Sequence, residues 1–128
     1  MENKEKYQIE VPVKASPQLL YQYISTPAGL ASWYADDVRA YEDHYVFVWN
    51  GVEENAQLWH KKLDDHIRFH WEEDSEATTF FEIRIRVNAL TNEVVLVITD
   101  FAPSSEIEDA KRLWELQITD LKAQIGAN

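Results

Sequence analysis

The hydrophobic pattern of this chain changes its period once, and that change restricts the folds that the chain can adopt. Before Pro103, apolar and polar residues alternate in several short segments, which is typical of half-buried strands. After Pro103, apolar residues recur every three or four positions, which predicts one long amphipathic helix over residues 104–125. Strands followed by a single long helix indicate an α+β domain rather than alternating strand–helix units.

Turn and cap signals divide the part of the chain before Pro103. Residues 6–13 alternate as a first strand. Ser16 and Thr26 are candidate N-caps of two short helices, and a proline follows each of them at the first helical position. Further strand-like segments then pair as hairpins, at residues 37–42 with 45–50, 54–65 with 66–73, and 78–90 with 93–102.

Most of these predicted strands have one apolar and one polar face. In an antiparallel sheet, such a pattern packs the apolar register on the core and leaves the other register in water. We therefore expect a strongly curved sheet of about seven strands that wraps around the C-terminal helix, in one domain over residues 1–128. The apolar register comprises Tyr45, Phe47, Trp49, Ile67, Phe69, Trp71, Phe81, Ile83, Ile85 and Val87.

Residues 15–38, ASPQLLYQYISTPAGLASWYADDV, resemble the opening of START-like domains. This is the helix-grip superfamily, also called SRPBCC, which includes birch-pollen-allergen-like proteins. The nearest subgroup is that of the C-terminal domain of the activator of the large heat-shock ATPase chaperone. Phe69 and Trp71 resemble the later aromatic strand of the family, and Trp114 lies in the final helix, where members often have a tryptophan. The opening motif is matched by Pro27, Gly29, Leu30, Trp33, Ala35, Asp36, Asp37 and Val38.

The resemblance implies a cavity between the sheet and the C-terminal helix, with the two short helices at its mouth. Family members carry lipids or hormones, cyclise polyketides or regulate chaperones. We therefore expect a protein that binds a small hydrophobic or lipid-like molecule without catalysis. The alternatives are a chaperone-regulating or other protein-interaction domain, and a polyketide cyclase-like enzyme. The candidate cavity-lining residues are Trp33, Tyr45, Phe47, Trp49, Phe69, Trp71, Phe81, Ile83, Ile85, Trp114 and Ile118.

The size of these side chains limits the ligand. Each aromatic ring buries about 150–250 Å², so the rings fill much of the interior, and the remaining pocket suits a flat or lipophilic neutral molecule. Two roles stay open for Trp33, which either wedges the fold together or lines the cavity. Asp36 and Asp37 are expected to cap helix ends or to pair with a base rather than to catalyse a reaction.

The charge of the chain excludes several partners. Twelve Lys and Arg face 23 Asp and Glu, a formal net charge of −11, so nucleic acid and anionic membrane surfaces are repelled. The N-terminus has no signal-peptide pattern and no apolar run is long enough to span a membrane, so we expect a soluble cytoplasmic protein.

Motifs for metal, cofactor or nucleophilic chemistry are missing from the sequence. The chain has no cysteine and no glycine-rich phosphate loop, so we predict no cofactor and no catalytic residue. His66 and His70 are four residues apart on a strand, about 13 Å, and cannot share one zinc ion. With His44 and His60, they are expected to be solvated surface histidines, and no metal site is predicted.

Two questions stay open at the level of sequence. The register of residues 54–65 decides whether His60 points into the cavity, and Trp59 and Leu63 favour the opposite register. Residues 94–98 are apolar on both faces, and this second apolar face either packs on a partner chain in a homodimer or reflects simple β-propensity.

Overall fold

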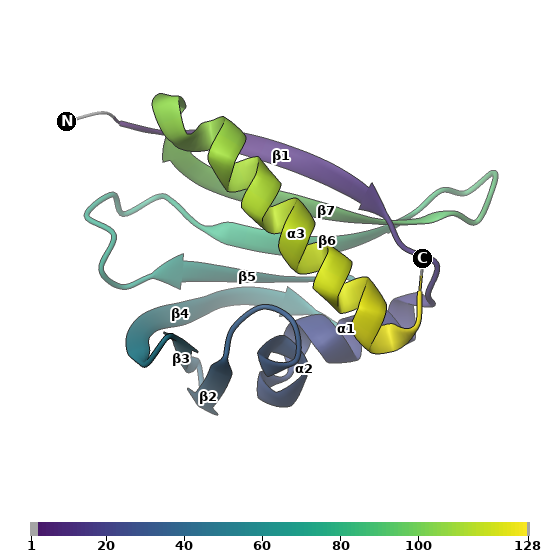
Figure 1. Ribbon diagram of the computed structural model, residues 1–128, viewed down its shortest axis with the longest axis horizontal. Helices are drawn as coiled ribbons and strands as arrows, with labels where there is room; N and C mark the ends of the chain where they lie inside the picture. The colour runs from purple at the N-terminus through teal and green to yellow at the C-terminus, as the bar shows by residue number, and fades with distance from the viewer. Residues whose placement is uncertain (1–2, 128) are drawn as a thin grey trace.

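The computed structural model describes residues 3–127, which form a seven-stranded antiparallel sheet crossed on one face by a long helix, as expected (Figure 1). The order of the strands is β1-β7-β6-β5-β4-β3-β2, so the first and the last strand of the chain lie side by side. No helix among the described residues is long and apolar enough to cross a membrane. The elements are β1 (Lys4–Pro12), α1 (Pro17–Ser25), α2 (Pro27–Ala31), β2 (Asp37–Tyr41), β3 (His44–Trp49), β4 (Val52–Lys62), β5 (His66–Trp71), β6 (Phe81–Val87), β7 (Val94–Pro103), η1 (Ser104–Glu106) and α3 (Ile107–Ile125).

The two short helices form as their cap residues predict. The Ser16 hydroxyl accepts a hydrogen bond from the Leu19 amide, and the Thr26 hydroxyl accepts one from the Gly29 amide. Thr26 also donates to the carbonyl of Gln22, so one side chain ends α1 and begins α2. A Cβ on Gly29 would lie 2.3 Å from the Gln22 carbonyl oxygen, so only glycine allows the two helices to pack this closely.

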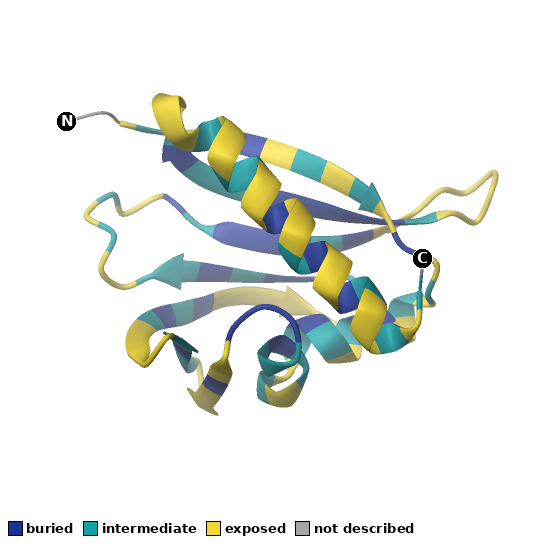
Figure 2. Cartoon of the chain, viewed as in Figure 1, coloured by how far each residue is buried: buried dark blue, intermediate teal, exposed yellow. Residues whose placement is uncertain are grey.

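The core lies between the sheet and α3. Phe47, Phe69 and Phe81 have no exposed surface, which confirms the predicted inward register of β3, β5 and β6. Val87, at the end of that register, is 45% exposed because β6 ends there, beyond the cover of the helix. Along α3, buried residues alternate with exposed ones at helical spacing (Figure 2). Trp114, Ile118 and Leu121 are the buried residues of α3.

A β-bulge decides the register of β4. Leu58 pairs with Phe69 and is buried, whereas His60 pairs with Arg68 on the outer face of the sheet. The extra residue at the bulge is Trp59, whose ring stacks on His70 at 4.5 Å, also outside. His60 therefore does not point toward α3.

The outer face of β7 is covered by the chain itself. Val95 and Val97 are 7% and 5% exposed. Their cross-strand neighbours are Arg86 on β6 and Glu10 on β1, and these two side chains form an ion pair of 2.5 Å across β7. The apolar face that suggested a homodimer is thus buried within one chain.

Candidate functional site

A cavity of about 420 Å³ lies between the sheet and the N-terminal half of α3. Its volume is in the range of small-molecule sites, roughly 300–1,000 Å³. A second hollow runs along the C-terminal half of α3 and shares Tyr34, Trp49 and Gln117 with this cavity, but it has fewer aromatic residues in its walls. Another lies beside the β6–β7 connection, away from the helix. We call it the aromatic cavity, and its walls are Tyr7, Tyr34, Trp49, Glu54, Trp71, Asp100, Phe101, Ala110, Leu113, Trp114 and Gln117.

Asp100 brings a carboxylate into the aromatic cavity. It follows Leu96 and Ile98 in the inward register of β7 and pairs with Tyr7 of β1. Its Oδ2 accepts a hydrogen bond from Trp114 Nε1 at 2.9 Å and a longer one from the Tyr7 hydroxyl at 3.4 Å. Its Oδ1 accepts one from the Phe101 amide at 2.7 Å.

Burial dominates the protonation of Asp100. It raises the pKa of the carboxyl from 3.8 to about 6, although the hydrogen bonds from Trp114, the Phe101 amide and Tyr7 favour the charged form and act in the opposite direction. The charge of Asp100 also contributes, after burial, to the raised pKa of the Tyr7 hydroxyl. Asp100 is therefore an ionisable group in an interior for which the sequence predicted only an apolar register, and it is the kind of inward acid or base that a cyclase-like enzyme requires.

Tyr34 forms the wall on the side of the α2–β2 connection. Its ring stacks on Trp114 with centroids 5.2 Å apart and meets Trp49 edge to face at 5.3 Å. Its carbonyl accepts hydrogen bonds from Trp49 Nε1 at 2.9 Å and Gln117 Nε2 at 3.1 Å, which tie the connection to β3 and α3. Burial raises the pKa of its hydroxyl, and the charges of Asp100 and Glu54 add to this shift.

With this geometry established, the comparisons with known proteins identify the family. A family model described as a START-like superfamily domain matches residues 1–127. The chain is a member of the START-like superfamily. The search of the curated proteins found no match.

Solved structures agree with this START-like assignment. BfR322 from Bacteroides fragilis is 34% identical, with a TM-score of 0.68 over 98% of this chain and 93% of that one. The Aha1 dimer from Colwellia psychrerythraea is 16% identical, with a TM-score of 0.75 over 92% and 93%. CalU16 from Micromonospora echinospora is 12% identical, with a TM-score of 0.73 over 95% and 74%. The last two show the fold alone.

The candidate residues of this START-like domain fall into three groups. Trp49, Trp71 and Trp114 line the aromatic cavity. Trp33 does not line this cavity: its indole donates to the Tyr23 carbonyl at 2.9 Å, and the residue lies in the wall of the neighbouring hollow along α3. The remaining candidates pack elsewhere in the core, namely Tyr45, Phe47, Phe69, Phe81, Ile83, Ile85 and Ile118.

The aspartates after Trp33 serve the backbone. Asp36 accepts a hydrogen bond from the Asn50 amide at 2.7 Å and so closes the turn before β4. Asp37 accepts one from the Val38 amide at the start of β2. Neither caps a helix, and neither lines the aromatic cavity.

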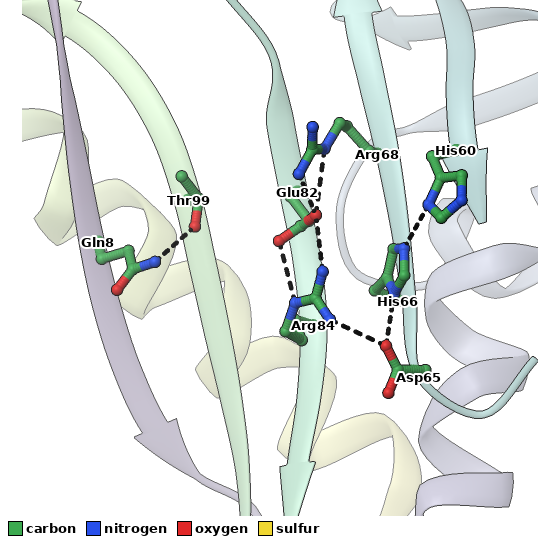
Figure 3. A network of polar contacts seen from close by, with 8 residues as sticks. All are labelled: Gln8, His60, Asp65, His66, Arg68, Glu82, Arg84 and Thr99. Atoms are coloured by element: carbon green, nitrogen blue, oxygen red, sulfur yellow. Dashed lines mark hydrogen bonds and ion pairs between the residues drawn. The ribbon is translucent and has the colours of Figure 1, made fainter. Parts of the chain in front are cut away.

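A polar network covers the outer face of this START-like sheet, on the side away from α3 (Figure 3). His66 is 5% exposed, and its ring nitrogens contact His60 Nδ1 at 2.6 Å and Asp65 Oδ2 at 2.5 Å. The prediction of a solvated histidine is therefore wrong for His66. Arg84 bonds both Asp65 and Glu82, which extends the network along β6. Among residues 3–127, no group of three or more His, Asp or Glu is arranged to hold a metal ion.

Proposed function

We propose that this START-like domain binds a small hydrophobic molecule in the aromatic cavity. The observation that supports the proposal is a hollow of about 420 Å³ with rings in its walls, Trp49, Trp71 and Trp114 among them. Removing about 200 Å² of apolar ligand surface from water contributes about 5 kcal/mol, before the cost of association. The fixed orientations of Trp49 and Trp114, whose N–H groups are both hydrogen-bonded inside the chain, reduce the ordering cost.

A blocked cavity tests this proposal. Ala110→Phe places a ring in the wall of the aromatic cavity, whereas Leu116→Phe adds a ring on an exposed position of the same helix outside it. Ligands from a panel of lipids and planar polyphenols are expected to raise the Tm of the wild type and of Leu116→Phe, and to leave Ala110→Phe unchanged. Equal responses of the two variants would place binding elsewhere. No response of any protein to the panel, together with no binding of small aromatic probes, neutral or cationic, would reject the proposal.

Asp100 favours a second candidate function, acid–base catalysis on a bound ligand. A carboxyl with a pKa of about 6 is ionised to a large extent near neutral pH and accepts protons there. If the domain is a cyclase-like enzyme, it closes a linear poly-β-ketone by intramolecular aldol condensation: Asp100 takes a proton from a CH₂ between two carbonyls, that carbon bonds to a distant carbonyl carbon, and water leaves. Asp100→Asn should lower this rate by about 10²-fold or more. Wild-type protein that returns such substrates unchanged would argue for binding alone.

A homodimer and a chaperone partner stay predictions. The Aha1 neighbour is described as a dimer, but its identity to this chain is 16%, a level that shows only the fold. The sedimentation mass at micromolar concentration tests the homodimer. Co-purification with the large heat-shock ATPase and a change in its ATPase rate test the chaperone partner.

A further inference from the structure

The charged side chains in the walls of the aromatic cavity are all negative. Its walls include the carboxylates of Asp100 and Glu54, and none of the described residues that line it is Lys, Arg or His. The charge of Lys4 acts on Asp100 and lowers its pKa slightly, but the Lys4 ammonium forms its ion pair with Asp74 at 2.8 Å. A ligand with a carboxylate or phosphate would therefore meet repulsion without compensation.

The hydrogen-bond donors that contact Asp100 are uncharged. Asp100 forms no ion pair with another described residue, and its acceptor bonds come from the uncharged donors of Tyr7, Trp114 and the Phe101 amide. A carboxylate oxygen accepts two hydrogen bonds, and Oδ1 accepts one here. Taking an unpaired carboxylate out of water is costly, and a cation beside it lowers that cost.

The rings beside Asp100 are suited to the same kind of ligand. Cations bind over the faces of tryptophan and tyrosine rings, within about 6 Å of the centroid. The N–H edges of Trp49 and Trp114 are engaged with the Tyr34 carbonyl and with Asp100. These two hydrogen bonds fix the indole planes, and Trp49 and Trp71 keep part of their surface exposed. Aromatic walls and an unpaired carboxylate are what an organic cation with an apolar body requires.

We propose that the aromatic cavity selects lipophilic organic cations, amines or quaternary ammonium compounds, with Asp100 as their counter-ion. The inference rests on the proposed ligand-binding function and replaces the neutral ligand expected from the sequence. Glu54, which is exposed, adds negative charge at the cavity wall without being buried against the ligand.

A matched pair of probes separates charge from shape. Phenyltrimethylammonium and tert-butylbenzene have nearly the same size and outline and differ by one positive charge. We expect wild-type protein to bind the cation at least tenfold more tightly, measured by quenching of tryptophan fluorescence and checked by NMR titration. Asp100→Asn is expected to remove this preference, with the affinity for tert-butylbenzene unchanged. The control Asp109→Asn removes the same charge from an exposed position of α3 outside the cavity and should keep the preference.

A pH titration of the wild type tests the inference without a substitution. The groups that face Asp100 are Tyr7 and Lys4 of β1, Tyr34, Glu54 of β4 and Trp114 of α3. Since burial raises the pKa of Asp100 to about 6, its ionised fraction falls about tenfold from pH 7 to pH 5. The affinity for the cation should fall toward that for tert-butylbenzene, by up to the same factor, and the affinity for tert-butylbenzene should not change.

The possible outcomes separate this inference from the function on which it rests. Equal affinities for the two probes, or equal losses in Asp100→Asn and Asp109→Asn, would overturn the selection of cations and leave hydrophobic binding intact. Absence of binding for both probes, together with no response to the lipid and polyphenol panel, would overturn both.

Discussion

The raised pKa of Asp100 predicts that this residue destabilises the fold at neutral pH. Burial raises the pKa of this carboxyl from 3.8 to about 6, so the folded chain binds more protons than the unfolded chain between these pH values. The folded state is therefore least stable at pH values where Asp100 is ionised. At 1.36 kcal/mol per unit of pKa, the difference corresponds to about 3 kcal/mol above pH 6 relative to low pH.

Asp100→Asn removes this titration and keeps an acceptor oxygen for the Trp114 indole. The free energy of unfolding of the variant minus that of the wild type should therefore increase with pH, by about 2 kcal/mol from pH 4.5 to pH 7, and then level off. Urea denaturation followed by tryptophan fluorescence measures it, with one curve per protein and pH. Other carboxylates, such as Asp74 with its lowered pKa, titrate in both proteins and cancel in the difference.

Asp109→Asn is the control, since it removes a negative charge from an exposed position of α3. Its difference from the wild type should not increase in this way over the same range. If the Asp100→Asn difference is independent of pH, the carboxyl is not buried in the folded chain as described, and the argument for a counter-ion role loses its electrostatic basis.

Three further predictions concern the packing around the cavity and the helices. Tyr34→Ala should cost about 3–5 kcal/mol in a urea melt because the ring contacts Trp114 and Trp49, whereas Tyr41→Ala, at a position 77% exposed, should stay within about 0.5 kcal/mol. Gly29→Ala should cost about 2–3 kcal/mol, because its Cβ would meet the Gln22 carbonyl oxygen at 2.3 Å; a melt equal to wild type would refute the close contact of α1 and α2. At Gly126 a Cβ would meet no other atom, and only the left-handed φ of 72° disfavours another residue, so Gly126→Ala should lower the free energy of unfolding by about 1 kcal/mol.

The fold was predictable because the two hydrophobic periods are clear in this sequence. Phe47, Phe69 and Phe81 occupy alternating positions that only an inward register satisfies, and Trp114 and Ile118 share a helical face. Ser16 and Thr26 cap the helices at the positions that their sequence context indicates.

The site was less predictable, and each miss has a physical cause. The bulge beside Leu58 cannot be read from alternation, since one extra residue changes the face of all that follow. It also brings His60 to His66, six positions along the chain. Asp100 did leave a signal, because it continues the alternation of Leu96 and Ile98, but the apolar run before it obscured which face was inward.

The hydrogen bonds to the Tyr34 carbonyl affect how a ligand enters the aromatic cavity. This carbonyl holds Trp49 of β3 and Gln117 of α3 at once, and Asp100 holds Trp114 one turn earlier. The middle of α3 is thus hydrogen-bonded to the rest of the domain at two successive turns, whereas the first turns of the helix have no such bond to the cavity walls among the described residues. Residues Ile107–Leu113 precede both hydrogen bonds, so we expect this end of α3 to move when a ligand too large for the cavity binds.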